Sequence, residues 1–591
     1  MGHHRRQLGA TLHDKGVDFA VWAPFAKSVS LLLLLDFDWE EHPLIKDEDG
    51  TWTIEDVDAK AGRSYKYKIV TPDGRELERN DPYARQLTDS DNGASIITVR
   101  DFEWEQASTF TPVPKELAVI YELHVGTFNR PDASTPGTFL TAIEKLDYLK
   151  DLGVTHIELM PITSMASSQG WGYAPNYIFS VENTYGGRRG LLDFVKACHE
   201  KGIGIILDVV YNHFGPGTDL WQFDGWSENG RGGIYFYNDE RGDTPWGGRP
   251  DYGRPEVRQF ILDNITMWLT EFKIDGLRVD STIYMRNSKG SSSEPDADIP
   301  DAWSLLADIT TLAKKINPRA LMIAEDTSSN AQLVSPVNDG GAGFDAQWEL
   351  GFPHVIRDSL NITQNPSQGR LDGIVWELNH SYTGNAFDKV IFSDSHDTTS
   401  NGSVRLNEAV SPGNAESVSA RHYALLANAV ALTAPGIPML LQGQEFMQEG
   451  AFHDWQMLEW NKTEQFSGIV LAHKHLISLR HNSYDNTRGL LGSGINVFHR
   501  DNDNNVIGYH RWDKGGPKDD TLIIVNSGGA RFKKYDITLP IGGDWRVRFN
   551  SSWKGYSSDF HETKVEVVRA SDDGNAELVI ADYGVLILSK D

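Results

Sequence analysis

The sequence is short of cysteine, of positive charge and of long apolar runs. Cys198 is the only cysteine among 591 residues, so no disulfide can form within the chain, which is typical of a reducing compartment. The 55 Lys and Arg face 83 Asp and Glu, giving a net charge of −28. Such a balance repels phosphate backbones and anionic lipids. We therefore expect no nucleic acid partner and no membrane partner.

Apolar runs such as Leu31 to Leu35 fall far below the roughly 20 residues that a membrane helix needs. The start, MGHHRRQLGATL, lacks the long apolar core of a secretory signal. We therefore expect a cytoplasmic protein, and a monomer. Neither an HExxH nor a CxxC pattern occurs, so we predict no metal and no cofactor. Cys198 lies in LLDFVKACHEKG, an amphipathic helical pattern that favours a packed side chain over a nucleophile.

The two ends of the chain carry short alternating runs that predict β-structure. Near the N-terminus these runs are VDFAVWA, SVSLLLLL, TWTIEDV and SYKYKIV, and they indicate a β-sandwich over residues 1–108. Towards the C-terminus the runs are NVFHR, VIGYHRW, TLIIVNS, WRVRFN and GVLILSKD. They predict a second β-sandwich over residues 491–591.

The middle of the chain, residues 109–490, alternates short apolar strands with amphipathic helical stretches. The candidate strands are LAVIYELHV, VTHIELMPI, IGIILDVV, IDGLRVD, ALMIAED, GFDAQWEL, KVIFSDSHD and IPMLLQGQEF. Strands that are apolar on both faces and separated by helices indicate a parallel sheet, and eight such units predict an α/β fold, the (β/α)8 TIM barrel. Residues 214–255, rich in Gly, Trp, Tyr and Asp, predict an insertion that covers the mouth after the third strand.

Four of these strands end in a carboxylate: Asp208, Asp280, Glu325 and Asp397. Reactive groups of such barrels lie at the C-terminal ends of the strands. A lone Asp at a strand end is more often a helix cap, but capping does not account for an ordered set of four. Arg278 precedes Asp280 by two residues and therefore lies on the same face of its strand, where it would hold that carboxylate ionised.

Two carboxyl groups flanking a glycosidic bond, about 5–5.5 Å apart, allow its cleavage with retention of configuration. In this interpretation Asp280 attacks the anomeric carbon and Glu325 serves as acid and then base. Asp397 holds sugar hydroxyls. His213 and His396 donate hydrogen bonds to the sugar.

These motifs resemble the α-amylase family of glycoside hydrolases and transglycosylases. The four family signatures are similar, in order, to DVVYNH (208–213), GLRVDS (276–281), AED (324–326) and SHD (395–397). The resemblance implies an enzyme acting on α-glucan, in which Asp280 is the nucleophile, Glu325 the acid/base and Asp397 the transition-state stabiliser. It further implies that Arg278 orients these groups and that His213 and His396 bind substrate. We place Asp208, Trp171 and Tyr173 in the same subsite.

Within the family the chain resembles the branching enzymes and the maltooligosyltrehalose trehalohydrolases. YELHVGTF, ELMPI, WGYAPNYIFSVENTYGG and GFDAQW are similar to both, whereas DSTIYMRN and FSDSHDTTSNGSVRL favour branching. Thr398 stands where branching enzymes often carry Glu, which leaves the acceptor open. A hydrolase acting on α-1,4-glucan and a trehalohydrolase are the alternatives. An inactive glucan-binding protein is a more distant one, because all three acidic residues are present.

Three smaller groups complete the expectations. Trp171 and Tyr173 are our predicted floor of the donor subsite, while Trp221, Trp226, Tyr235 and Trp246 fit sugar platforms and core positions equally. Asn212 is predicted to hydrogen-bond a carboxylate rather than to bind calcium, which needs about 6–8 oxygens. Gln442, Gln444 and Glu445, at the end of the eighth strand, predict a structural hydrogen-bond network.

Overall fold

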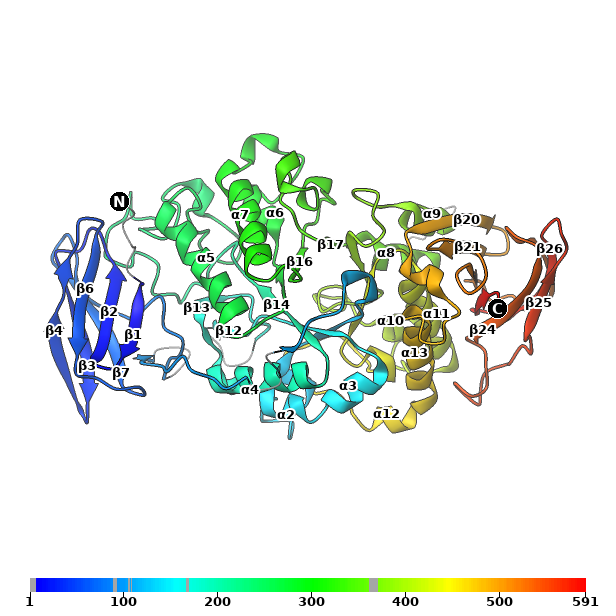
Figure 1. The fold of residues 1–591 in the computed structure, drawn as a ribbon, viewed down its shortest axis with the longest axis horizontal. Helices are drawn as coiled ribbons and strands as arrows, with labels where there is room; N and C mark the ends of the chain where they lie inside the picture. Colours follow the sequence, from blue (N-terminus) through cyan, green and yellow to red (C-terminus); the bar gives the residue numbers. More distant parts are fainter. Residues whose placement is uncertain (1–6, 89–92, 105–106, 108, 166–169, 361–369) are drawn as a thin grey trace.

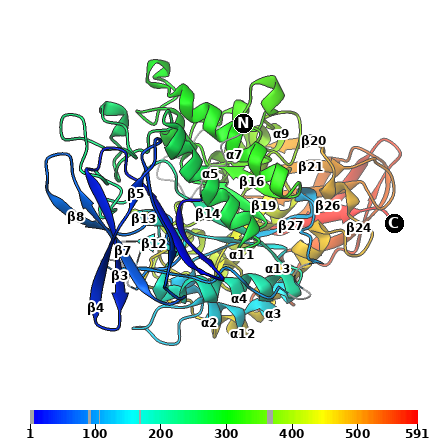
Figure 2. The same ribbon diagram turned by 60° about the vertical axis from the view of Figure 1, so that its left-hand side comes forward.

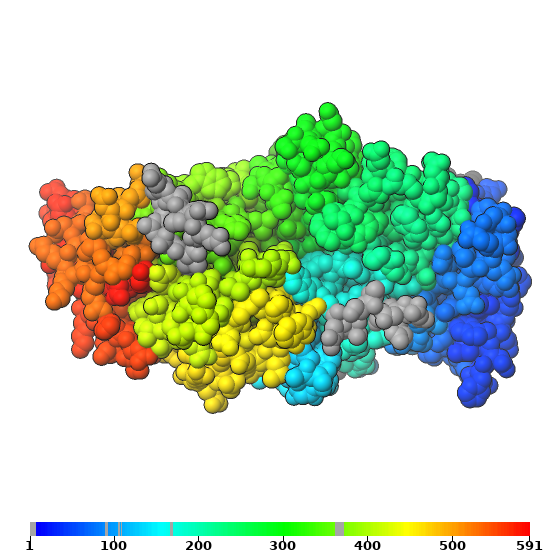
Figure 3. Space-filling model, turned by 180° about the vertical axis from the view of Figure 1, so that it is seen from behind, coloured from blue at the N-terminus to red at the C-terminus, as the bar shows by residue number. Residues whose placement is uncertain are grey.

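The computed structural model describes residues 7–88, 93–104, 107, 109–165, 170–360 and 370–591. Three parts follow one another along the long axis: a β-domain at the N-terminal end, a barrel in the middle and a second β-domain at the C-terminal end (Figure 1). The view from behind shows the same order (Figure 3). Within the described part, no helix is long and apolar enough to cross a membrane. Ser108, at the predicted domain boundary, lies outside the described residues.

The N-terminal domain consists of two antiparallel sheets, which confirms the predicted sandwich. Its alternating strands bury one face between the sheets, where Phe19, Leu31, Leu33 and Tyr67 lie. In Figure 2 the molecule is turned so that this domain lies nearer the viewer. One sheet is formed by β1 (Gly9–His13), β2 (Gly16–Trp22), β6 (Thr51–Val57) and β5 (Ile45–Lys46), and the other by β4 (Asp38–Pro43), β3 (Ser28–Leu35), β7 (Ser64–Val70), β8 (Glu76–Arg79) and β9 (Ser95–Ile96).

The middle of the chain forms a closed parallel barrel, and all eight predicted strands belong to it. Nearly every residue of these strands is buried, because the inner face packs on itself and the outer face is covered by helices. The strands are β10 (Ile120–Leu123), β11 (His156–Leu159), β14 (Gly204–Val209), β15 (Gly276–Val279), β16 (Leu321–Ala324), β17 (Ala346–Trp348), β18 (Lys389–Ile391) and β19 (Ile437–Leu441). The predicted α/β barrel is thereby confirmed.

Helices surround the barrel, and shorter helices lie in the segments that connect its strands. Those with eight residues or more are α4 (Gly187–Glu200), α5 (Pro255–Thr270), α7 (Pro300–Ile316), α8 (Gly351–Ser359), α9 (Arg370–Asn379), α11 (Val418–Thr433) and α13 (Ser467–Arg480). Shorter ones are α1 (Val125–Phe128), α2 (Phe139–Ile143), α3 (Leu146–Leu152), α6 (Thr282–Arg286), α10 (Leu406–Val410) and α12 (Lys462–Gln465). Cys198 is fully buried in α4, as predicted.

A long segment without an α-helix joins β14 to α5, and it packs against the N-terminal domain. The backbone N–H of Phe25 donates to Asp224 (2.9 Å), and the Phe25 ring stacks on Trp226 with centroids 4.4 Å apart. Asn80 donates to Asp219 at 2.9 Å. The N-terminal domain therefore supports the segment that follows the third barrel strand. A further hairpin, β12 (Thr163–Met165) with β13 (Pro175–Val181), follows the second barrel strand.

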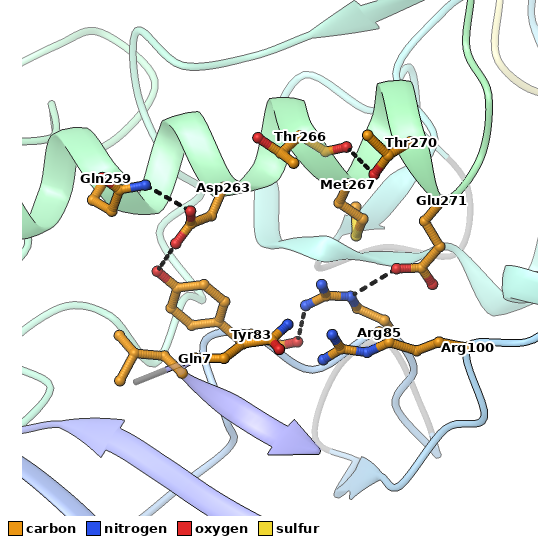
Figure 4. Close-up of a pocket in the computed structure, with 11 residues that line it drawn as sticks. Gln7, Tyr83, Arg85, Arg100, Gln259, Asp263, Thr266, Met267, Thr270 and Glu271 are labelled. Atoms are coloured by element: carbon orange, nitrogen blue, oxygen red, sulfur yellow. Dashed lines mark hydrogen bonds and ion pairs between the residues drawn. The ribbon is translucent and has the colours of Figure 1, made fainter. Parts of the chain in front are cut away.

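A pocket of about 620 Å³ lies at the same domain interface, between α5 and the chain that leaves the N-terminal sheets (Figure 4). At one end the Tyr83 hydroxyl donates to Asp263 on α5 at 3.0 Å. At the other end Glu271, just after α5, pairs with Arg85 at 3.5 Å and with Arg188 at 2.9 Å. One carboxylate thus connects two guanidinium groups across the interface.

The C-terminal domain is an eight-stranded antiparallel sheet that folds over on itself. The hydroxyl of Tyr535 on β23 and the ring of His499 on β20 lie 2.7 Å apart, although these strands are the two ends of the sheet. One core cluster draws on both halves, as the predicted sandwich requires. The strands are β20 (Gly494–Asp501), β21 (Val506–Trp512), β22 (Thr521–Asn526), β23 (Phe532–Thr538), β24 (Gly543–Asn550), β25 (Val567–Ala570), β26 (Asn575–Ile580) and β27 (Val585–Ser589).

Candidate active site

Arg278 lies at the centre of the candidate site. Its guanidinium Nη1 donates to Asp208 Oδ2 and to Asp280 Oδ1, both at 2.7 Å, and its Nη2 lies 3.6 Å from Glu325 Oε2. These groups come from the neighbouring parallel strands β14, β15 and β16. Arg278 is fully buried, with its guanidinium 4.4 Å from the ring centroid of Trp348. Three carboxylates therefore converge on one cation at the C-terminal ends of adjacent strands.

Both oxygens of Asp280 are held by donors. Oδ1 accepts from Arg278 and Oδ2 accepts from the Asn212 side-chain amide at 2.7 Å. Hydrogen bonds to a carboxylate favour its charged form and fix its orientation. The prediction that Asn212 bonds a carboxylate of this site is confirmed. A carboxylate that is held in one orientation and has limited exposure can serve as a nucleophile.

Glu325 carries its proton at neutral pH. Burial raises its pKa to about 8, with the charges of Asp280 and Asp397 adding to the effect and Arg278 opposing it. Its Oε2 accepts from the Ser281 backbone N–H at 2.6 Å. Acid-assisted displacement at a glycosidic bond needs one carboxyl group that donates a proton and a second one that attacks.

Asp397 and His396 form an ion pair at the end of the seventh strand. Burial opposes a charge on the His396 ring, but Asp397 and Glu122 together raise its pKa well above its usual range. Its Nε2 lies 3.3 Å from Asp397 Oδ1, and its Nδ1 lies against Glu122 Oε1. Desolvation of Asp397 is in turn outweighed by His396, which lowers the pKa of Asp397 to about 2. The Asp397 side chain is 45% exposed, so it is a charged group open to a ligand.

Tyr173 and Trp171 border His396. The Tyr173 ring stacks on His396 (5.2 Å between centroids, 18°), and its hydroxyl donates to Asp208 Oδ2 at 2.6 Å. Trp171 meets His396 edge-on at 5.7 Å. Gly172 between them has φ +91°, and a Cβ there would lie 2.3 Å from the Pro161 carbonyl oxygen. The pair therefore depends on glycine at this turn.

Asp208 and His213 are also brought to the site. Burial raises the pKa of Asp208 to about 7, and burial lowers the pKa of His213, so the His213 ring is neutral at pH 7. Trp246, 48% exposed, lies against His213 with centroids 5.5 Å apart. The other aromatic residues of the insertion have different surroundings. Tyr235 is buried in the core, Trp226 packs on the N-terminal domain, and Trp221 is 41% exposed.

Three residues of the site escaped the sequence interpretation: Glu122 on β10, Glu158 on β11 and Trp348 on β17. Glu122 pairs with His396. Glu158 is almost fully buried, and burial raises its pKa well above the usual range. A glutamate within each of the apolar strands IYEL and HIEL was the available signal, since an acidic residue in a buried strand needs a partner or a proton.

The eighth strand end carries the predicted structural network. Gln444 donates to Ser393 at 2.6 Å and Gln442 donates to Thr127 at 2.8 Å. Glu445 accepts from the hydroxyls of Tyr121 (3.1 Å) and Tyr148 (3.0 Å). These bonds connect the end of the last strand to the first strand and to neighbouring loops, next to the β10–β19 ladder that closes the barrel.

Among the described residues, the group with metal-ligand atoms in reach of one another is His13, Asp18 and Asp56, in the N-terminal domain. His13 Nδ1 accepts from the Lys15 backbone N–H (3.2 Å), so in the neutral ring Nε2 carries the proton and donates to Asp18 (3.0 Å). Hydrogen bonds therefore engage both ring nitrogens of His13. The absence of a metal requirement stays a prediction.

Comparison with known families identifies the fold and the class. The alpha amylase catalytic domain matches residues 122–242 and 226–488, carbohydrate-binding module 48 (isoamylase N-terminal domain) matches residues 7–84, and the alpha amylase C-terminal all-beta domain matches residues 497–591. The barrel and its acidic strand ends are those of a glycoside hydrolase or transferase. The chain belongs to the alpha-amylase family.

Curated relatives carry two activities. A 1,4-alpha-glucan branching enzyme of Corynebacterium jeikeium is 31% identical over 573 residues, covering 92% of this chain and 77% of the relative. One of Bacillus caldolyticus is 30% identical over 617 residues, covering 97% and 87%. A malto-oligosyltrehalose trehalohydrolase of Saccharolobus solfataricus is 32% identical over 488 residues, covering 76% of each chain.

Solved structures share the fold at lower identity. A pullulanase of Anoxybacillus sp. LM18-11 complexed with maltotetraose superposes with a TM-score of 0.78 at 21% identity, covering 100% of this chain and 88% of the pullulanase. A type I pullulanase of Bacillus subtilis complexed with maltose gives 0.78 at 20% identity, covering 100% and 86%. These likenesses support the three-domain architecture.

Proposed function

We propose that this protein is a 1,4-α-glucan branching enzyme. It would cleave an α-1,4 bond of an α-glucan with retention and transfer the released chain to a 6-hydroxyl, forming an α-1,6 branch. We further propose that it acts as a monomer in the cytoplasm, with domains 1–108, 109–490 and 491–591. Support for branching comes from the relatives of that activity, which match more than nine tenths of the chain.

The proposed reaction has two displacements. An oxygen of Asp280 attacks the anomeric carbon while Glu325 gives its proton to the leaving 4-oxygen, so the glycosidic bond breaks and a glycosyl–Asp280 ester forms. Glu325, now ionised, takes the proton of an incoming 6-hydroxyl. That oxygen attacks the same carbon and releases Asp280, which restores both groups and gives net retention.

The surrounding residues have binding and orienting roles in this scheme. Arg278 and Asn212 keep Asp280 ionised and aimed. Asp397, charged and exposed, binds sugar hydroxyls and stabilises the oxocarbenium-like transition state. His396, His213 and Asp208 provide polar contacts to the same sugar, while Tyr173 and Trp171 provide its aromatic floor.

One observation carries the proposed retaining cleavage: a single buried guanidinium holds Asp280 and approaches Glu325, while burial leaves the proton on Glu325. This arrangement serves transfer to water as well as to a hydroxyl. The acceptor must therefore be tested directly, and a trehalohydrolase relative of 32% identity makes that activity the second candidate.

The decisive experiment incubates the protein with amylose and follows iodine colour and reducing ends together. Loss of colour with few new ends supports branching, and isoamylase digestion of the product then releases short chains. Matching growth of reducing ends indicates hydrolysis instead. Maltooligosyltrehalose supplied as substrate tests the second candidate, because release of trehalose would replace the branching proposal.

Glu325→Gln separates catalysis from glucan binding by an inactive protein. We expect this variant to lose on the order of 10²-fold or more of the rate, because the proton donor is gone. Unchanged turnover by Glu325→Gln would contradict the assignment of this residue.

A further inference from the structure

Trp455 lies in the loop that follows the eighth barrel strand, and no role in the site described above uses it. Its side chain is 59% exposed, a large apolar surface to leave in water. Its ring lies flat against His453, with centroids 4.9 Å apart and an interplanar angle of 15°. His453 is also exposed, and so is Met457, at 40%. Exposed side chains therefore alternate with less exposed ones along this loop tip.

Backbone hydrogen bonds hold the loop at both ends, so its tip has a defined position on the surface. The Phe452 backbone N–H donates to the Thr399 carbonyl at 2.8 Å, and the Leu458 N–H donates to the Thr127 carbonyl at 3.3 Å. Between them, Gln456 N–H closes a turn onto His453 O at 3.3 Å, and Arg130 donates to the Trp455 carbonyl oxygen. The indole is thus held in one orientation before any ligand arrives, which lowers the entropy cost of binding.

The same loop reaches the candidate active site through Phe452. This buried ring contacts Trp171 (5.5 Å between centroids) and His396 (6.3 Å), and its backbone is bonded to the residue two positions after Asp397. Trp455 follows Phe452 by three positions, so their Cα atoms are at most about 11 Å apart. Trp455 therefore lies at the rim of the mouth, within a few sugar lengths of Asp397.

We propose that Trp455, backed by His453, is a stacking site for a glucose unit of the α-glucan chain that extends out of the active site. The flat indole with one face covered by imidazole and the rest open matches the apolar face of a pyranose ring. The site adds affinity for long chains without touching the reacting bond. This inference rests on the proposed α-glucan substrate and assigns a distal subsite to it.

The test measures binding in the Glu325→Gln background, where no bond is cleaved. Maltose, maltotriose and maltoheptaose are titrated against that protein with and without Trp455→Ala, by isothermal calorimetry. We expect Trp455→Ala to weaken maltoheptaose binding about tenfold, corresponding to about 1.4 kcal/mol, and to leave maltose unchanged. Trp455→Phe should restore most of the affinity.

Trp376→Ala is the matched control. Trp376 is 54% exposed and its ring also stacks on a histidine, His380, at 4.4 Å and 12°, but it belongs to α9, which packs against α8 and β20. Equal maltoheptaose affinity in Trp455→Ala and Trp376→Ala would overturn the inference and leave the proposed function intact. Equal weakening for all three sugars would also overturn it, because that pattern indicates a distorted mouth. Failure of the Glu325→Gln parent to bind any of them would reject the proposed function as well.

Discussion

Glu325 and Asp280 have different surroundings although one arginine lies next to both. Asp280 accepts two strong hydrogen bonds, whereas Glu325 is buried and faces Asp280 and Asp397. The different roles proposed for these two carboxyl groups therefore follow from their different surroundings. The raised pKa of Glu325 leads us to two predictions about the effect of pH.

The first concerns the rate. Because the pKa of Glu325 is raised to about 8, the acid form predominates at neutral pH and is lost as the pH rises through that value. We expect kcat/KM for amylose to fall on the alkaline side with a midpoint near pH 8. An initial-rate profile in buffers of constant ionic strength measures it. An alkaline limb that lies near pH 6 would contradict the assignment of the proton to Glu325.

The second concerns stability. The native state holds the Glu325 proton up to about pH 8, whereas the unfolded chain releases it near the ordinary value of 4.5. The native state therefore binds more protons in this window, and the free energy of unfolding falls as the pH rises through it. Glu325→Gln removes this loss, so the variant should gain stability over the parent, by an amount on the order of a few kcal/mol at pH 8.

Urea unfolding at several pH values measures this difference. Below pH 4.5 the carboxyl is protonated in both states, so the pH-dependent part of the gain should vanish there. A gain that is the same at every pH would show that the buried proton is not its cause.

Some of these residues could be predicted from the sequence and others could not. Arg278 and Asp280 share a face because strands alternate, and that rule needs no tertiary information. Glu122 and Glu158 lie in strands whose other residues are mostly apolar. The positive charges that act on these two carboxyl groups belong to His396 and Arg278, which are more than a hundred positions away. Tyr173 was predicted as a sugar platform, but its bond to Asp208 depends on a turn whose direction no local pattern specifies.

At the scale of elements, burial on both faces made the barrel strands recognisable. Among the strands missed in the C-terminal sheet is β23, an edge strand whose exposed positions carry Lys, Asp and Thr. The alternation is real in β23, with Tyr535 and Ile537 buried, but its charged partners obscure it. Sheet edges in contact with water are where sequence patterns are weakest.

The interface between the N-terminal domain and α5 gives an element-scale prediction. Glu271 holds Arg85 and Arg188 while remaining largely buried. Glu271→Gln would leave two guanidinium groups without a counter-charge, so we expect a loss of about 3 kcal/mol in unfolding free energy. Asp193→Asn is the matched control, because the Arg189–Asp193 pair on α4 is exposed and should contribute less than about 1 kcal/mol. Equal effects of the two substitutions would contradict a buried ionic link between the domains.

The whole molecule carries a net charge of −28, spread over three domains in a row (Figures 1 and 3). Like charges on one compact body repel, and salt screens that repulsion over a Debye length of about 30 Å at 0.01 M and about 8 Å at 0.15 M. We expect the midpoint of thermal unfolding to rise between these two NaCl concentrations. A fall would show that attractive ion pairs outweigh the net repulsion.

Ser281, the residue after Asp280, adopts a left-handed backbone conformation with φ 41° and ψ 57°, and its N–H points at Glu325 Oε2. In the protonated form of Glu325, the oxygen that accepts this bond and lies on the Arg278 side is the carbonyl oxygen, which carries no hydrogen. The transferable hydrogen must then reside on Oε1. In the proposed mechanism, the backbone conformation of Ser281 thus sets the side of Glu325 from which the departing sugar oxygen takes its proton.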